Sequence, residues 1–171
     1  DGGAKYKGHC GGLIGLTDAI TISNCVVENN TFDVLGARGG LFIGSAQHNS
    51  AVSGTVAGNT GLDKLCGEVN NIKDWSNVKV QIAEGLYKTG LVYSVTKAEG
   101  LVALSSMTIK ANESVVLEAD IDLAGVEFNG LYAHNSENDN TFDGQGHTVS
   151  NWTNEKGLSD LGFIKGWVGT I

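Results

Sequence analysis

The stretch Cys10-Gly11-Gly12-Leu13-Ile14-Gly15 returns 28 residues later, at position 38, as Arg38-Gly39-Gly40-Leu41-Phe42-Ile43. It returns another 28 residues on, at position 66, as Cys66-Gly67-Glu68-Val69, and a related Leu161-Gly162-Phe163-Ile164-Lys165-Gly166 stands near position 171. Self-similarity at a fixed period is typical of a solenoid, in which each unit buries its apolar face against its neighbours. We therefore expect stacked coils, with Leu13 above Leu41 in the core. The repeat positions with this structural role are Gly12, Leu13, Ile14, Gly40, Leu41, Phe42, Gly162, Phe163 and Ile164.

A second landmark keeps nearly the same spacing. Thr21-Ile22-Ser23-Asn24 is echoed by Thr148-Val149-Ser150-Asn151, and Asn29-Asn30-Thr31 is echoed 29 residues later, at position 58, by Gly58-Asn59-Thr60. A spacing of 28 in one column and 29 in the next indicates turns that accept single insertions while the strands stay aligned. Asn30 and Asn59, one coil apart, are expected to stack as an amide ladder.

Composition favours a β protein rich in turns. The chain has 25 glycines among 171 residues and no proline, without a three-residue period, so the glycines are expected to serve turns that need positive φ. Short β-prone runs such as residues 114–117 and 147–150 are bounded by Gly, Asn, Asp and Ser. With 41% hydrophobic residues, the chain is long enough for one sizeable core.

The charge balance excludes some partners. Asp and Glu number 19 against 11 Lys and Arg, a formal net charge of -8. Such a surface repels a phosphate backbone, so we expect no nucleic-acid partner. No apolar stretch approaches the roughly 20 residues of a membrane-spanning helix, and Asp1 does not open a signal peptide. We expect no membrane insertion, and a soluble chain processed or excised from something longer.

Three cysteines are too few for a disulfide framework. Cys10 and Cys66 fall in one column of the repeat with Arg38 between them, which predicts backbones about 9.6 Å apart, beyond the reach of a disulfide. Cys25 aligns with Gly54 and is expected to be a small buried residue. The four histidines, His9, His48, His134 and His147, make no zinc-ligand spacing with these cysteines.

One helix is predicted over residues 96–107. Thr96 and Glu99 have the spacing of a capping box, and apolar residues from Ala98 to Met107 form a stripe. Such a helix could cover the open end of a β stack, so we expect a cap rather than a catalytic helix. After it, Glu118, Asp120 and Asp122 alternate with aliphatic residues, which puts three carboxylates on one face of a strand.

Several residues could carry chemistry, and each also has a structural interpretation. The three carboxylates at 118, 120 and 122 could bind calcium or catalyse, although a solvated strand face explains them as well. Calcium is also possible in the loop that contains Glu137, Asp139 and Asp143, although the EF-hand spacing is missing. The turn residues Asp143, Gly144, Gly146 and His147 are assigned a structural role, with His147 hydrogen-bonded locally. Trp75, Trp152 and Trp167 could form a sugar-stacking platform, but packing against the core explains them better.

These motifs together resemble the GLUG-type repeats of bacterial surface proteins of the Bacteroidetes type. The resemblance rests on Gly12-Leu13-Ile14-Gly15, on Ala98-Glu99-Gly100-Leu101 before Leu117-Glu118-Ala119-Asp120-Ile121-Asp122-Leu123, and on Phe142-Asp143-Gly144-Gln145-Gly146-His147-Thr148. It covers residues 91–171 and 8–70. It implies an all-β, right-handed parallel β-helix with one short capping helix, exported to the surface and used in adhesion. It implies no active site.

The order of the parts departs from that family. Here the Gly-Gly-Leu coils come first and the helix only at Thr96. We therefore predict coils at 1–72, a connector at 73–90, and a capping helix with the first coils at 91–171. Read cyclically, 91–171 followed by 1–72 would form one permuted stack.

Three function classes follow. The expected one is a non-catalytic, secreted or cell-surface adhesion module without a cofactor, whose partner is a host or bacterial glycan or protein. A subunit that self-associates end to end into a fibre is the first alternative. A β-helix polysaccharide lyase or hydrolase is the second, although the basic residues that such an enzyme needs are scattered.

Overall fold

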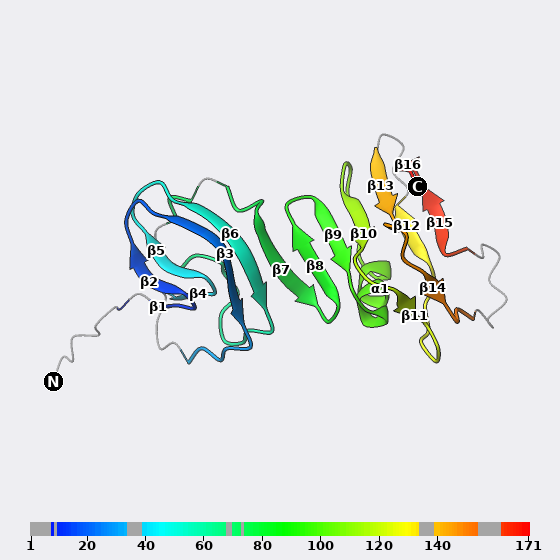
Figure 1. Ribbon diagram of the computed structural model, residues 1–171, viewed down its shortest axis with the longest axis horizontal. Coiled ribbons are helices and arrows are strands. Elements are labelled where there is room, and N and C mark those ends of the chain that lie inside the picture. The colour runs from blue at the N-terminus through cyan, green and yellow to red at the C-terminus, as the bar shows by residue number, and fades with distance from the viewer. Residues whose placement is uncertain are drawn as a thin grey trace. The chain divides into compact units, whose positions relative to one another are not determined.

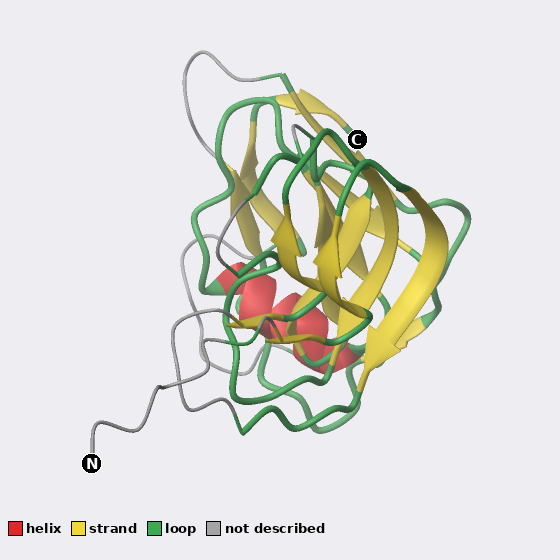
Figure 2. Ribbon diagram, turned by 90° about the vertical axis from the view of Figure 1, so that its left-hand side faces the viewer, coloured by secondary structure: helices red, strands yellow, loops and turns green. Residues whose placement is uncertain are grey.

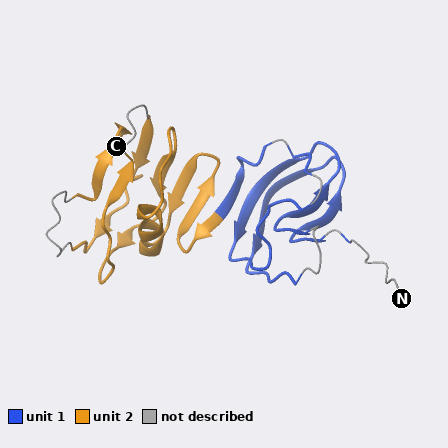
Figure 3. Ribbon diagram, turned by 180° about the vertical axis from the view of Figure 1, so that it is seen from behind, with its two compact units in different colours: residues 1–80 blue, residues 81–171 orange. Residues whose placement is uncertain are grey.

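The computed structural model describes residues 8, 10–33, 39–67, 70–72, 74–133, 139–153 and 162–171. Its contacts divide the chain into two compact units, Asp1–Val80 (unit 1) and Gln81–Ile171 (unit 2), shown in different colours in Figure 3. The described residues are mostly strand, with one short helix (Figure 2). Each unit is described by itself.

Unit 1 is made of strands that pair in parallel with the strands of the following coil, where a coil is one turn of chain around the core. The strands are β1 (Cys10–Gly11), β2 (Ile14–Thr17), β3 (Thr21–Glu28), β4 (Gly39–Gly40), β5 (Ile43–Ala46), β6 (Ala51–Ala57) and β7 (Val78–Ala83), which reaches across the boundary at Val80. β1 pairs with β4, β2 with β5, and β3 with β6, which pairs in turn with β7 (Figure 1). Short Gly- and Asn-containing corners join one sheet to the next.

The register of these coils differs by one residue from the sequence repeat. Gly11 lies opposite Gly40 and Ile14 opposite Ile43, a shift of 29, so the expected stacking of Leu13 on Leu41 is wrong. Leu13 is 40% exposed, whereas Leu41 and Phe42 are buried. A glycine pair carries no side chain that could fix the register. The pairing of Ile14 with buried Ile43 fixes it instead.

Gly11 and Gly40 have matching surroundings, which supports the shift of 29. A Cβ atom on Gly11 would lie 2.1 Å from the Ile14 carbonyl oxygen, and one on Gly40 would lie 2.1 Å from the Ile43 carbonyl oxygen. In each case the next contact, at 2.6 and 2.7 Å, is a glycine backbone nitrogen of the following coil. Only glycine fits this close approach of backbones.

The third coil of unit 1 is shorter than the repeat predicts. Ile43 lies opposite Cys66, a shift of 23, and Gly54 opposite Val78, a shift of 24. Cys66 therefore stacks in the column of Ile14 and Ile43, and the expected column of Cys10, Arg38 and Cys66 is wrong. Arg38 itself lies outside the described residues, as do Glu68 and Val69.

The core of unit 1 lies between its sheets. Phe42 and Ile43 are fully buried at its centre. The remaining buried apolar residues are Ile22, Val27, Leu41, Ala46, Val52, Val56, Cys66, Ile72 and Val78. Fully burying one side chain of this kind contributes roughly 1.5–3 kcal/mol, so this cluster is the main source of stability for the unit.

Unit 2 contains an antiparallel hairpin followed by parallel coils. Its strands are β8 (Leu86–Thr89), β9 (Val92–Val95), β10 (Ser114–Leu117), β11 (Ile121–Asp122), β12 (Leu131–Ala133), β13 (Asn140–Asp143), β14 (Val149–Ser150), β15 (Ile164–Trp167) and β16 (Gly169–Thr170). β8 and β9 pair antiparallel. The other pairs, β9–β10, β10–β13, β13–β16, β11–β14 and β12–β15, are parallel.

The fold expectation is confirmed at the level of class. The chain is all-β apart from one short described helix. The largest sheet is nevertheless mixed, because β8 and β9 run antiparallel while β9, β10, β13 and β16 run parallel. A parallel solenoid through the whole chain is therefore not what the strands form.

The helix α1 (Ala98–Ser105) lies within the predicted range but begins differently. Its N-cap is Lys97, which makes no side-chain capping bond, so the capping box of Thr96 and Glu99 does not form. Thr96 instead donates its N–H to the Gly85 carbonyl oxygen at 2.9 Å. α1 contacts β8, β9 and β12, and its Leu101 and Leu104 are fully buried in the core of unit 2.

The core of unit 2 joins aliphatic and aromatic side chains. Leu117, Ile121 and Leu131 are buried beside the helix. An aromatic chain continues this core, with ring centroids 5.2 Å apart for Phe128 and Phe163 and 5.8 Å for Phe142 and Phe163. Phe163 and Ile164, two predicted repeat positions, are half-buried against this core, and Gly162 beside them is half-buried as well.

The unit boundary falls inside the predicted connector. Residues 73–90 contain β7 and β8, and the boundary lies between Val80 and Gln81. The cyclic permutation of 91–171 with 1–72 stays a prediction.

Candidate functional site

Unit 1 carries an open groove of about 660 Å³ at one corner of its coils. The corner joins the sheet of β2 and β5 to the sheet of β3, β6 and β7. The lining residues are Ala19, Ile20, Thr21, Ile22, Ser23, Asn49, Ser50, Ala51, Val52, Ser53, Asp74 and Asn77. Three successive coils thus contribute, and a volume of this size lies in the range of ordinary ligand sites.

A β-bulge shapes the floor of the groove. The register of β3 on β6 shifts between Ile22 and Cys25, and Asn24 takes a left-handed φ of 54°. Its N–H is satisfied by Ser53 Oγ of the next coil at 3.1 Å. Bulges re-aim side chains and are frequent beside functional sites.

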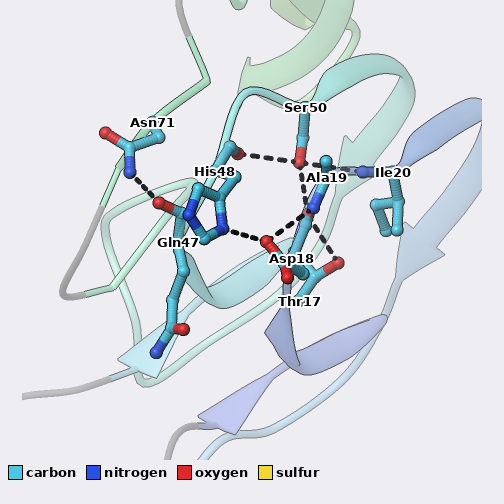
Figure 4. A network of polar contacts seen from close by, with 8 residues as sticks. All are labelled: Thr17, Asp18, Ala19, Ile20, Gln47, His48, Ser50 and Asn71. Carbon is cyan, nitrogen blue, oxygen red and sulfur yellow. Dashed lines mark hydrogen bonds and ion pairs between the residues drawn. The ribbon is translucent and has the colours of Figure 1, made fainter.

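Asp18, His48 and Ser50 form a polar network at the edge of the groove (Figure 4). His48 Nδ1 contacts Asp18 Oδ1 across neighbouring coils, and both side chains are exposed. Ser50 Oγ accepts the N–H of Ile20 at 3.3 Å and lies 2.9 Å from the Asp18 carbonyl oxygen and 3.2 Å from that of His48. Figure 4 shows these contacts together with Asn71, whose side chain donates to the Gln47 carbonyl oxygen.

The network has the residue types of a hydrolase triad but not its geometry. A nucleophilic serine needs its hydroxyl hydrogen-bonded to the histidine ring. Ser50 Oγ bonds to backbone carbonyl oxygens instead. The three residues therefore tie two coils together at the corner.

A second Asp–His pair lies in unit 2, at the predicted Asp-Gly-Gln-Gly-His turn. His147 Nδ1 lies 3.2 Å from Asp120 Oδ1, which also accepts the Thr148 N–H at 2.9 Å. These bonds, first from Thr148 and then from His147, hold the pKa of Asp120 below its ordinary value. The partner of the His147 side chain is thus one coil away, and the expected local side-chain bond is wrong.

The turn itself is held by its own backbone. Asp143 Oδ1 accepts the Gln145 N–H at 2.9 Å, and the His147 N–H donates to the Gly144 carbonyl oxygen at 2.8 Å. Gln145 and Gly146 both have positive φ, 48° and 78°. These bonds agree with the structural role assigned to the turn.

The structure brings together no calcium site from the predicted residues. Asp139 and Asp143 are exposed, and Glu137 lies outside the described residues. Asp122 Oδ1 accepts hydrogen bonds from Asn151 and Ala124, which lower its pKa. Among the described residues no group of three or more His, Cys, Asp or Glu side chains could hold a metal ion.

A buried polar cluster in unit 2 was not predicted. The Glu113 carboxylate, 2% exposed, accepts bonds from Lys88 Nζ at 2.5 Å and from the Lys110 N–H at 2.7 Å. Burial would raise the pKa of Glu113, but these bonds lower it below the ordinary value. Lys88 also lies 4.3 Å from the Tyr93 ring centroid. The contacts come from segments distant in sequence, so no local signal in the sequence marked them.

The thiols and the tryptophans are structural. Cys10, Cys25 and Cys66 are free thiols. Burial raises the pKa of Cys66, which makes it a poor nucleophile. Cys25 does lie opposite Gly54, as expected. The three predicted tryptophans, Trp75, Trp152 and Trp167, are half-buried against the two cores, as expected.

The amide ladder is confirmed. Asn30 Nδ2 donates to Asn59 Oδ1 at 3.0 Å, and Asn59 Nδ2 donates to the Val27 carbonyl oxygen at 2.8 Å. Thr31 and Thr60 continue it, with 3.3 Å between their hydroxyl oxygens. Polar side chains of neighbouring coils thus satisfy each other.

Sequence reasoning missed the groove and the Asp18–His48 pair. The pair is separated by 30 positions, close to the spacing of the Asn30–Asn59 ladder. A search for complementary polar residues at about one coil length would have found it. His9 and His134 lie outside the described residues.

No family model, no curated protein and no solved structure matches the chain. Within the described ranges, no helix is long and apolar enough to cross a bilayer.

Proposed function

We propose that this protein is a non-catalytic interaction module of the cell surface or of a secreted chain, built from parallel β-helix coils. Its partner is a surface glycan or protein. The coil proposal is supported by the parallel registers within each unit, such as Ile14 on Ile43 and Ile121 on Val149. The hairpin of β8 and β9 interrupts the coils in this proposal.

One observation carries the non-catalytic part. The polar side chains that could perform chemistry bond to the neighbouring coil and do not converge on one reactive atom. Asp18 binds His48, Asp120 binds His147, and Ser50 is held by backbone carbonyl oxygens. A glycosidase or lyase needs a carboxylate pair or a base placed beside a basic group in one cleft.

The test is incubation with neutral and acidic polysaccharides, with and without calcium, followed by assays for reducing ends and unsaturated products. We expect no turnover from the wild type. Folding is checked by circular dichroism. Turnover that disappears in folded Asp143→Asn, His147→Ala or His48→Ala variants would overturn the proposal.

Self-assembly is a second candidate, favoured by the free edges of two strands. Among the described strands β3 pairs only with β6, and β16 pairs only with β13. β3 also exposes Val26, 58% accessible. Free parallel edges of this kind can pair with another copy, head to tail.

Sedimentation velocity over a range of concentrations tests this candidate. If copies associate through β3, Val26→Lys should shift the distribution to monomer, and the control Leu91→Lys, at another exposed apolar residue, should not. A wild type that stays monomeric at all concentrations contradicts self-assembly.

A further inference from the structure

The groove of unit 1 presents a row of uncharged polar groups from successive coils. Thr21 and Ser23 come from β3, Asn49 from the next corner, and Asn77 from the corner before β7. At about 4.8 Å per parallel strand, three coils place these groups along roughly 10 Å of the surface. The repeat of the coils thus becomes a repeat of hydrogen-bonding groups.

These groups are available to a ligand. The side chains of Thr21, Ser23, Asn49 and Asn77 are exposed, and none makes a hydrogen bond to another described residue. This contrasts with Asn30 and Asn59, whose amides are used within the ladder. Hydroxyl and carboxamide groups donate and accept, and they suit a ligand that is rich in hydroxyl groups.

Small apolar side chains separate the polar ones. Ala19 and Ala51 are exposed and Ile20 is half-buried, so they offer flat contact to the C–H face of a sugar ring. No aromatic ring lies among the described lining residues. Recognition would rest on hydrogen bonds, with modest affinity.

The charge of the lining favours an uncharged ligand. Its one ionisable side chain is Asp74, whose Oδ1 accepts the Ser76 N–H at 2.7 Å. Hydrogen bonds from Ser76 lower the pKa of Asp74, so it is anionic at neutral pH. Together with the net charge of -8, this carboxylate repels uronic or sialic acids. Lys73 beside it lies outside the described residues.

We propose that this groove, formed by residues 19–23, 49–53, Asp74 and Asn77, binds a neutral carbohydrate segment. The site rests on the proposed function, since it gives the interaction module its ligand. The bulge at Asn24 and the contacts of Asp18, His48 and Ser50 hold the groove in shape.

The test uses a panel of neutral gluco-, manno-, galacto- and xylo-oligosaccharides, with oligogalacturonate and sialyllactose as acidic probes. Binding is followed through amide chemical shifts at millimolar ligand concentration. We expect at least one neutral probe to shift the amides of residues 19–23 and 49–53, and the acidic probes to leave them unchanged. No shift with any neutral probe, or preference for the acidic probes, overturns the proposal.

A groove-filling variant localises the site. Ala51 is exposed within the groove, so Ala51→Trp fills it, whereas the control Ala124→Trp changes an exposed alanine of unit 2. Ala51→Trp should abolish binding of the neutral probe, and Ala124→Trp should not. Equal binding by both variants places the ligand elsewhere and overturns the site, while the absence of turnover would still support the non-catalytic proposal.

Single hydrogen-bonding groups give the finer readout. Asn77→Ala should weaken the neutral probe about threefold to tenfold, the effect of one hydrogen bond, while Asn129→Ala, at an exposed asparagine of unit 2, should have no effect. Asp74→Asn keeps the acceptor for Ser76 and removes the charge. It should let the acidic probes bind, and unchanged rejection of them would contradict the charge argument.

Discussion

Two glycines of one turn differ in what they require of the backbone. Gly146 has a φ of 78°, a conformation that L side chains rarely adopt, whereas Gly144 has no such φ. A Cβ atom at either position would meet nothing within 4 Å. The sequence motif presents the two glycines alike, but the backbone needs only Gly146 to be glycine.

We therefore expect Gly146→Ala to lower the free energy of unfolding by about 1–2 kcal/mol, the cost of a left-handed residue. Gly144→Ala should change it by less than about 0.5 kcal/mol. Urea unfolding followed by tryptophan fluorescence measures both. Equal effects of the two substitutions would show that φ is not what the turn selects.

Lys88 is the partner that makes a buried carboxylate tolerable. Lys88→Met leaves Glu113 buried without its ammonium partner, so we expect a loss of about 3 kcal/mol or more at pH 7. The exposed pair of Lys97 and Glu84 offers a control, because Lys97→Met should change stability little.

The same variant has a signed pH dependence. In the wild type the pKa of Glu113 is lowered, so its contribution is present above the ordinary Glu value near 4.3 and is lost as pH falls through the folded value. In Lys88→Met the carboxylate can protonate, which relieves the penalty. The difference in unfolding free energy between the two proteins should therefore narrow from pH 7 to about pH 4. A constant difference would mean that Lys88 acts through packing alone.

At the scale of elements, the strands of unit 1 align through buried side chains. Leu13 and Leu41 match in sequence, yet only Leu41 is buried, and Ile43 is fully enclosed. Ile43→Ala should therefore cost about 2–5 kcal/mol, and Leu13→Ala less than about 1 kcal/mol. Denaturant titration of both variants checks the register. Comparable losses would favour the register of the sequence repeat.

The sequence predicted what depends on local chemistry. Turn glycines, the Asn30–Asn59 ladder and the alternation of Asp120 and Asp122 with buried Ile121 follow from periodicity, and the structure contains them. The register of Gly11 and Gly40 did not follow, because neighbouring glycines look alike in either alignment. The N-terminus of α1 did not follow either, since the Thr96 N–H is used by Gly85, a contact with the preceding hairpin. The groove depends on three coils at once, so no single motif marked it.

The whole molecule contains two cores that share no side chain. One is centred on Phe42 and Ile43 and the other on Leu117, Ile121 and Leu131. A cavity in one core removes contacts from that core only. Hydrogen exchange of Ile43→Ala should therefore show lost protection in unit 1, and Leu131→Ala should show it in unit 2. Loss of protection throughout the chain in either variant would show that the units unfold together.

Coils of unequal length with aligned strands have a consequence for how such chains diverge. From β3 to β6 the partners are 29 or 30 positions apart, whereas from β6 to β7 they are 24 apart. The missing residues come out of the corners, and the buried columns stay intact. Descendants of one ancestral coil can therefore lose or gain corner residues without repacking the interior, and selection can try new surfaces there while the interior is inherited unchanged.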